Sequence, residues 1–253
     1  MQIEVAGHQT HLESSGNPDG PLVVFIHGSG SHGVAWTHQL QGLADAGCWL
    51  LAPDSPGHGQ SAGELLTNIA DQADWLAALL AKLGRERASV VGHSMGALAA
   101  LEFAARYPAL TNRIVLVGAV PRMAVNPDLL ALAKANDPQA GRLLASWSCC
   151  KGDESAEIRQ IAEARYLKNP PGVLWNDLNA CDRYLDLDEA AAKVTCPVAV
   201  ISGSEDRMTP ASGGQELAAR FQGGQHYAID AAGHQVMQEQ PAGVNRLLRD
   251  MLS

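Results

Sequence analysis

The sequence predicts an α/β protein with a doubly wound, mostly parallel sheet into which a helical cap is inserted. Three features of the 253 residues support this fold class. Short, wholly apolar runs recur along the chain, and such runs are typical of strands buried on both faces of a parallel sheet. Segments with helical periodicity separate these runs, as expected where helices connect parallel strands. Residues 121–193 contain helix-like segments but no apolar run of this kind, which indicates an insertion.

The predicted strands come from short segments with apolar or alternating patterns. Residues 2–5 and 9–13 alternate weakly, which predicts a short hairpin. The run at residues 22–26 is continuously apolar, as expected for a central strand of a parallel sheet. We expect strands over residues 2–5, 9–13, 22–26, 48–52, 88–91, 113–118, 198–202 and 225–230.

The predicted helices lie between these strands. Asn68 can begin a helix because its side chain can accept a hydrogen bond from the first turn, and Gly84 can end it because glycine readily adopts a left-handed conformation. Pro241 suits the first turn of a closing helix. We expect helices over residues 34–46, 97–107, between Asn68 and Gly84, and from Pro241 onward.

The pattern divides the chain into a core and an insertion. Residues 1–120 and 194–253 carry the predicted strands and form the α/β core. Residues 121–193 lack a convincing buried strand and form the predicted cap. The segment Asn169-Pro170-Pro171-Gly172 interrupts the cap with a turn.

Composition limits the kinds of partner. The formal net charge is −9, from 18 Lys and Arg against 27 Asp and Glu, so we expect no nucleic-acid partner. The N-terminus lacks the features of a signal peptide, and no apolar run approaches the ~20 residues of a membrane helix. We therefore expect a cytoplasmic protein without a membrane contact. The 5 cysteines include no Cys-x-x-Cys pair, which indicates neither a disulfide framework nor a zinc site.

One stretch carries the strongest functional signal. The predicted strand at residues 88–91 ends in the β-branched pair Val90-Val91, which leads into Gly92-His93-Ser94-Met95-Gly96, and a helix-forming segment follows. A Gly-x-Ser-x-Gly sequence between a strand and a helix is typical of a nucleophile elbow, in which a strained turn exposes the serine hydroxyl. Ser94 is therefore the predicted nucleophile.

A serine nucleophile needs a base and a carboxylate. His234 follows the predicted strand at 225–230, and Asp206 follows the strand at 198–202. The C-terminal ends of parallel strands share one edge of a sheet, where open α/β sheets bind their ligands. Glu205 stands next to Asp206 and is the alternative acid. We predict a triad of Ser94, His234 and Asp206.

The chain resembles the serine-dependent α/β-hydrolases over nearly its whole length. The resemblance is strongest at residues 27–30, 54–61, 92–96, 203–210 and 233–241. It implies an α/β-hydrolase fold and an oxyanion hole made by the backbone N–H groups of Ser29 and Met95. It also implies that the cap selects the substrate. No metal ion or cofactor is implied.

Several other residues have two interpretations. His27, His58 and His93 fit packing or loop-bracing roles better than catalysis. Trp147, Trp175 and Tyr184 are candidates for binding the substrate from the cap side, together with Cys149 and Cys150. The same residues can equally form the small core of the cap itself.

A dinucleotide fingerprint competes with the hydrolase prediction. Gly28, Gly30 and Gly33 match Gly-x-Gly-x-x-Gly after a buried strand, and Asp54 follows at the end of the next strand. That pattern predicts an oxidoreductase. It leaves Ser94, whose context matches the elbow, without a role, so we favour the hydrolase.

The predicted reaction is hydrolysis of a small carboxylic ester through an acyl-enzyme. The sequence does not separate this reaction from hydrolysis of a C–C bond, a thioester or a lactone. Perhydrolysis and a lyase reaction that uses the same triad also remain alternatives. The expected partner is a small-molecule substrate, and no oligomeric state is predicted.

Overall fold

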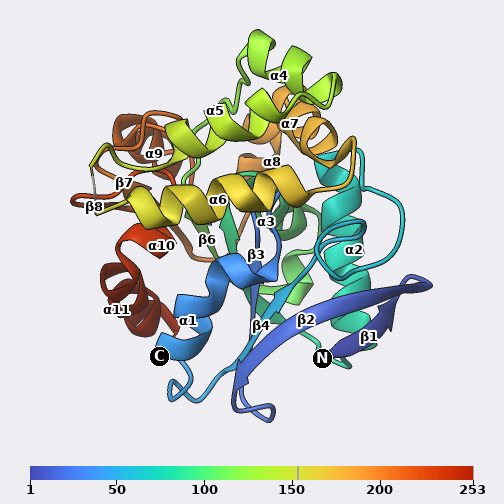
Figure 1. Ribbon diagram of the computed structural model, residues 1–253. Helices are drawn as coiled ribbons and strands as arrows, with labels where there is room; N and C mark the ends of the chain where they lie inside the picture. Colours follow the sequence, from blue (N-terminus) through green and yellow to red (C-terminus); the bar gives the residue numbers. More distant parts are fainter. Residues whose placement is uncertain (153, 253) are drawn as a thin grey trace.

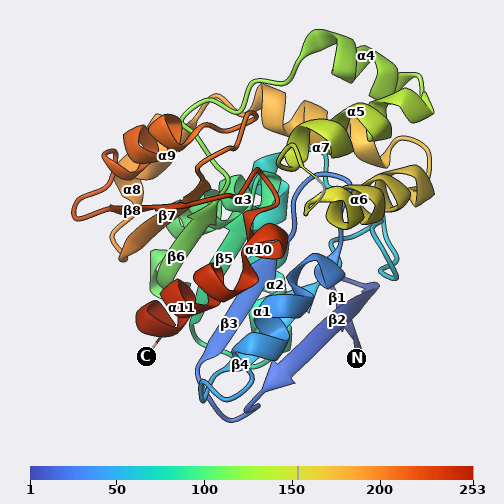
Figure 2. The same ribbon diagram turned by 60° about the vertical axis from the view of Figure 1, so that its left-hand side comes forward.

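An eight-stranded sheet crosses the molecule, with helices on both of its faces (Figures 1 and 2). The computed structural model describes residues 1–152 and 154–252. The second strand in the sequence pairs antiparallel with both of its neighbours, and the strands beyond it run parallel. Across the sheet the strands are β1 (Gln2–Val5), β2 (His8–Gly16), β4 (Trp49–Pro53), β3 (Leu22–Ile26), β5 (Ala88–His93), β6 (Thr111–Val117), β7 (Val198–Gly203) and β8 (Gln225–Ile229).

Two apolar clusters, one on each face of the sheet, form the core. One face packs against α2 (Ile69–Lys82), α3 (Met95–Arg106), α8 (Leu187–Lys193) and α9 (Ala211–Ala218). The other packs against α1 (Thr37–Gly42), α10 (Val236–Glu239) and α11 (Pro241–Leu252). Helices on both faces explain why β3 and β5 are buried along their whole length. The prediction of a doubly wound, mostly parallel sheet is confirmed.

Local sequence signals set most element boundaries. The Asn68 side chain accepts a hydrogen bond from the Asp71 N–H (2.8 Å) at the start of α2, and Gly84 beyond its end has a φ of +66°. The helix expected over 34–46 is shorter. It consists of the 3₁₀ helix η1 (Gly33–Trp36) and α1, which ends at Gly42. A Cβ at Gly42 would lie 2.0 Å from the Asn245 side chain, so the close approach of α11 coincides with the end of α1.

The segment between β6 and β7 is helical, and no strand occurs in its described residues, 118–152 and 154–197. Four of its helices lie above the C-terminal ends of the parallel strands (Figure 1). They share an apolar cluster that includes Leu129, Leu144, Tyr166 and Leu178. The fifth, α8, packs against α3 in the core. The four are α4 (Pro127–Lys134), α5 (Pro138–Ser148), α6 (Ala156–Lys168) and α7 (Val173–Arg183).

We refer to α4–α7 as the cap. The bounds 121–193 expected for an inserted domain stay a prediction. Across residues 1–152 and 154–252, no helix has both the length and the apolar character needed to cross a membrane.

Candidate active site

Ser94 occupies a strained turn between β5 and α3. Its φ of +53° and ψ of −115° lie in a region that residues other than glycine rarely adopt, and the surrounding glycines explain how the turn fits. A Cβ at Gly92 would lie 2.0 Å from the Gly96 carbonyl oxygen, and one at Gly96 would lie 2.4 Å from the Ile26 carbonyl oxygen. Only glycine allows these backbone approaches, so the turn has the geometry of a nucleophile elbow.

His234 and Asp206 form a buried pair at the ends of the two strands beyond β6. His234 Nδ1 lies 2.8 Å from Asp206 Oδ2, and the two side chains are 3% and 0% exposed. A carboxylate only accepts hydrogen bonds, so the His234 proton on this side sits on Nδ1. Glu205 is exposed and makes no such contact. The structure therefore brings Asp206, and not its neighbour, to His234.

Several donors hold Asp206 in its charged form. The backbone N–H groups of Met208 and Thr209 donate to Oδ1 (2.8 and 2.9 Å), and the Thr209 hydroxyl donates to Oδ2 (2.5 Å). Burial opposes the charge, but His234 and the Thr209 donors outweigh it and lower the pKa of Asp206 to about 2. Asp206 is a fixed anion at neutral pH.

His93 holds the His234 loop through a hydrogen bond to its backbone. Its Nε2 donates to the His234 carbonyl oxygen (2.8 Å), and the two rings lie 4.7 Å apart. Burial and the facing His234 lower the pKa of His93 to about 3, so its ring is neutral. The bracing role expected for His93 fits this geometry.

Two backbone amides are available to an oxyanion. Met95 is the first residue of α3, where helix N–H groups have no partner within the helix. Ser29 lies in the loop over residues 27–33, which we call the oxyanion loop. Neither amide has an acceptor among residues 1–152 and 154–252. The Ser29 hydroxyl contacts Cys181 Sγ (3.7 Å), so the group that Ser29 can offer to an oxyanion is its backbone N–H.

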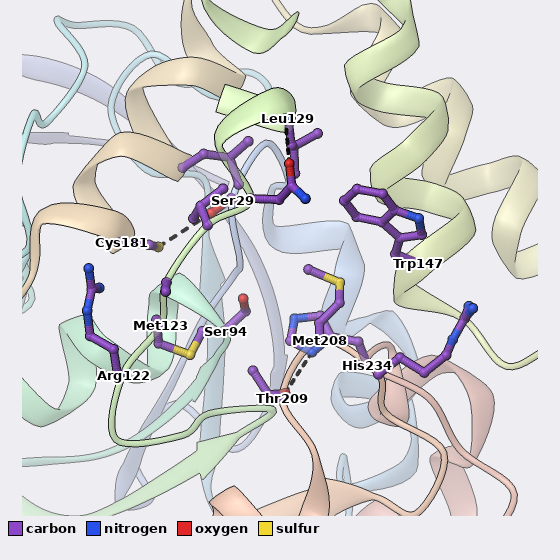
Figure 3. Close-up of a pocket in the computed structure, with 15 residues that line it drawn as sticks. Ser29, Ser94, Arg122, Met123, Leu129, Trp147, Cys181, Met208, Thr209 and His234 are labelled. Carbon is purple, nitrogen blue, oxygen red and sulfur yellow. Dashed lines mark hydrogen bonds between the residues drawn. The ribbon is translucent and has the colours of Figure 1, made fainter. Parts of the chain in front are cut away.

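Two spaces adjoin Ser94 and His234, and Figure 3 shows the larger one. The outer cavity has a volume of about 380 Å³. Its wall is mostly apolar and includes Trp147 of α5, while Arg122 and Arg207 line it as well. The inner cavity, about 30 Å³, lies under the oxyanion loop. Besides Ser94 and His234 it is lined by Gly28, Ser29, Ser31, His93, Leu144, Tyr166, Leu178, Met208 and Gln235.

Trp175 and Tyr184 lie elsewhere, contrary to the expectation that they bind substrate. Both line a separate groove beside α2. The helical period of α7 explains this placement. Leu178 and Cys181 face the outer cavity, whereas Trp175 and residues 179 and 183 lie on another face of the helix. Of the three predicted cap aromatics, only Trp147 reaches the cavities at Ser94.

The dinucleotide interpretation fails at Asp54. In that fingerprint the acidic residue binds a ribose hydroxyl and must be accessible. Here Asp54 is 1% exposed, and its two oxygens accept the N–H groups of Gly33 (2.7 Å) and Gln60 (2.8 Å). The glycines of this segment belong to the oxyanion loop, and Asp54 braces it.

Sequence reasoning missed three charged residues around the site. Asp177 of α7 binds the oxyanion loop, because it accepts the Gly30 N–H (2.8 Å). Glu239 of α10 binds the His234 loop, because it accepts the Gly233 N–H (2.8 Å). Arg165 of α6 is 8% exposed and donates to the Ser31 hydroxyl (3.2 Å). Asp177 could have been found, because it interrupts an apolar helical stripe.

The thiols and the acidic clusters offer no other chemistry. All five cysteines are free. Burial raises the pKa of Cys149 to about 11 and that of Cys181 to about 12, so neither is a thiolate at neutral pH. In the described part of the chain, no group of three or more His, Cys, Asp or Glu residues is arranged to hold a metal ion.

Comparisons with known proteins agree with this geometry. Residues 23–247 match the model of the alpha/beta hydrolase family. A putative carbamate hydrolase, RutD, from Escherichia coli O7:K1 (strain IAI39 / ExPEC) is 30% identical over 249 residues, which cover 93% of this chain and 92% of that protein.

Solved structures show the same fold. The enol-lactonase from Burkholderia xenovorans LB400 superposes with a TM-score of 0.91 at 22% identity, covering 100% of this chain and 99% of the other. A thermophilic esterase from Thermogutta terrifontis gives a TM-score of 0.89, also at 22% identity, with coverages of 100% and 98%.

Proposed function

The chain belongs to the alpha/beta hydrolase family, and from that premise we propose that it is a serine hydrolase that cleaves a small carboxylic ester. One observation carries the proposal: Ser94 and His234 line one cavity, and Asp206 lies 2.8 Å from the far nitrogen of the His234 ring. Ester hydrolysis needs a nucleophile, a base that can also act as an acid, and donors for an oxyanion. The site offers each of them.

In the proposed reaction, Ser94 Oγ attacks the ester carbonyl while His234 Nε2 accepts its proton. Asp206 keeps a proton on Nδ1 and stabilises the imidazolium. The N–H groups of Ser29 and Met95 bind the oxyanion of the tetrahedral intermediate. The C–O bond then breaks, His234 protonates the leaving alcohol, and an acyl-enzyme remains. Water attacks the acyl group with the same help and releases the acid.

The names of some of the similar proteins fit this bond class. One structural neighbour is called an esterase and another an enol-lactonase, while the E. coli relative is called a putative carbamate hydrolase. We therefore expect an acyl carbon bonded to a leaving heteroatom. Thioesters and lactones belong in the same activity screen, and so do perhydrolysis and lyase substrates.

The two cavities beside Ser94 suggest the size of the substrate. The two halves of an ester extend in different directions from the scissile carbon, and the spaces of about 380 and 30 Å³ differ strongly. We propose that one half of the substrate is short, about the size of an acetyl or methyl group. Esters that are bulky on both sides should be poor substrates.

A matrix of esters tests the proposal directly. Acetates of bulky alcohols, methyl esters of long acids, and esters with two long halves should be assayed with the wild-type protein and with Ser94→Ala. We expect turnover of one of the first two classes, and none by the variant. A Ser94→Ala protein that retains turnover contradicts the assignment, and equal rates for all three classes contradict the size argument.

A second candidate substrate class rests on Arg165. This guanidinium is nine-tenths buried, yet it forms no salt bridge with a carboxylate among the described residues. Its hydrogen bond goes to the hydroxyl of Ser31, which lines the inner cavity. Buried arginines are usually paired, because an uncompensated charge is costly. A substrate carboxylate in the inner cavity would supply the missing charge, which favours an acid-bearing lactone or a C–C bond substrate.

The variant Arg165→Met separates the two candidates. If the substrate carries a carboxylate, KM for an acidic ester should rise about tenfold or more relative to an uncharged ester of equal size. Arg142→Met, an exposed arginine on α5, is the matched control. An equal change of KM for both esters would show that Arg165 does not bind a substrate carboxylate.

A further inference from the structure

Asp177 links the cap to the oxyanion loop. Its side chain is 1% exposed, although it lies on α7, which belongs to the cap. Oδ2 accepts the Gly30 N–H at 2.8 Å and lies 2.8 Å from His58 Nε2, while Oδ1 accepts the Asn176 side-chain amide at 3.2 Å. One buried carboxylate thus joins a cap helix to the loops that follow β3 and β4.

The His58–Asp177 pair is ionised. His58 Nδ1 lies 3.0 Å from the Pro56 carbonyl oxygen, which can only accept, so a proton is fixed on Nδ1. Nε2 faces a carboxylate and carries the second proton. Burial lowers the pKa of His58, but Asp177 outweighs burial and raises it above its usual value. Burial likewise raises the pKa of Asp177, but His58 and the Gly30 amide hold it below its usual value.

Three successive peptide units of the oxyanion loop are each held by a side chain. The first carries the Ser29 N–H, and its carbonyl accepts a hydrogen bond from the His27 ring (2.9 Å). The second donates the Gly30 N–H to Asp177 (2.8 Å). The third begins at the Gly30 carbonyl, which accepts the Asn169 amide (2.8 Å). The cap contributes the second and third supports.

We propose that Asp177 is a positioning residue for the oxyanion hole. Its carboxylate, anchored by His58, fixes the Gly30 peptide and with it the direction of the neighbouring Ser29 N–H. The consequence is that the hole is complete only while the cap is seated on the core. Asp177 touches no reacting atom, and its contribution should appear in the transition state rather than in substrate affinity.

Asp177→Asn tests the proposal, which rests on the proposed ester hydrolysis for its kinetic part. The amide keeps the size of the side chain but cannot serve as the counter-ion of His58 and also accept the Gly30 N–H. We expect kcat to fall about 10- to 100-fold and KM to change less than about threefold, because a displaced donor weakens transition-state binding. Asp188→Asn, on the exposed side of α8, is the matched control and should keep wild-type kinetics.

A second variant keeps the test decisive if Asp177→Asn folds poorly. Asn169→Ala removes the neighbouring support from a half-exposed position, so the fold should tolerate it. We expect kcat to fall about three- to tenfold with little change in Tm. In the double variant the fold-decrease of kcat should be smaller than the product of the two single fold-decreases, because both substitutions act through the Gly30 peptide.

Three results would overturn the proposal. One is wild-type kcat in either variant. Another is a loss of affinity for the product acid by the same factor as the fall in kcat, because a general loss of structure would weaken both. The third concerns hydrogen exchange at the Gly30 amide, which should be slow in the wild-type protein and faster in Asp177→Asn. Unchanged exchange refutes the positioning role even if no ester is hydrolysed, so this failure is distinct from failure of the proposed function.

Discussion

Two buried histidine–carboxylate pairs lie near the oxyanion loop, and they differ in what the second ring nitrogen faces. The His234–Asp206 and His58–Asp177 distances are both 2.8 Å, and all four side chains are at most 3% exposed. The remaining nitrogen of His58 faces the Pro56 carbonyl oxygen, whereas His234 lines the cavities at Ser94.

This difference separates a structural cation from a candidate base. A ring with acceptors at both nitrogens must keep both protons, so His58 cannot take a proton from a substrate. A ring with one acceptor and one open nitrogen can be neutral and can accept a proton, as a general base must. The same pair of residue types therefore serves two purposes, and the neighbour of one nitrogen decides which.

The largest expected effect comes from breaking the His234 pair. Asp206→Asn leaves the size of the side chain unchanged but no longer fixes the proton on Nδ1. We expect kcat to fall on the order of 10⁴-fold if the pair behaves as in serine proteases. Steady-state kinetics with a p-nitrophenyl ester measure this. Glu205→Gln is the control and should be close to wild type, and the reverse ranking would transfer the role to Glu205.

Breaking the other pair should affect stability first. His58→Gln leaves Asp177 charged and buried without its counter-ion, which costs about 3 to 5 kcal/mol in comparable buried pairs. Urea unfolding measures the free energy of unfolding, and adding Asp177→Asn should recover part of the loss. A His58→Gln protein as stable as the wild type would mean that the pair is not ionised.

The neutral histidines should make the fold sensitive to acid. Burial, together with His58 and His234 respectively, lowers the pKa values of His27 and His93 to about 3. Between pH 6.5 and about 3 the unfolded chain therefore binds two protons that the folded protein does not. Stability is fully present above pH 6.5 and decreases as the pH falls, by about 2.7 kcal/mol per unit in the middle of this window.

His58 behaves in the opposite way, because its pKa is raised. The contribution of His58 to the free energy of unfolding is complete below pH 6.5. It is lost as the pH rises through the pKa that His58 has in the folded protein. Urea unfolding at several pH values should show both trends, and His93→Asn should halve the acidic slope. A free energy of unfolding that is constant from pH 6.5 to 4 would contradict the neutral state of His27 and His93.

The smallest expected effect concerns Thr209, whose hydroxyl donates to Asp206. Thr209→Val keeps the shape and removes one of the donors that hold the carboxylate. A charge-assisted hydrogen bond is worth about 1.5 kcal/mol, so kcat should fall about tenfold. The kcat–pH profile distinguishes loss of this hydrogen bond from a packing defect. Without the donor the Asp206 carboxylate is protonated more easily, so kcat should fall most at acidic pH, whereas a packing defect should lower kcat equally at every pH.

The core could be predicted because local sequence encodes it. Apolar runs such as residues 22–26 identify the strands, and Gly92 and Gly96 around Ser94 identify the turn. Parallel strand ends then bring distant loops together without further information. The length of α1 was not predictable, because the contact between Gly42 and Asn245 depends on the tertiary packing of α11.

The cap was harder to predict because residue type alone does not show which face of a helix lines the cavity. Trp175 and Tyr184 are large and aromatic, yet they lie in a groove away from Ser94. The informative feature of the sequence was an acidic residue on the apolar face of a helix. Asp177 lies on the same helical stripe as the apolar Leu174, Leu178 and Cys181, and only a dedicated partner makes such a position tolerable.

The reactivity of Ser94 toward a fluorophosphonate tests the central claim most directly, because the reagent measures activation of the serine without assuming a substrate. In the wild-type protein the label should map to Ser94, and His234→Gln should slow labelling by at least about 10³-fold. Under the same conditions His58→Gln, if folded, should slow it less than about 10²-fold. Labelling at another residue, or equal rates in His234→Gln and the wild type, would contradict the assignment of His234 as the base that activates Ser94.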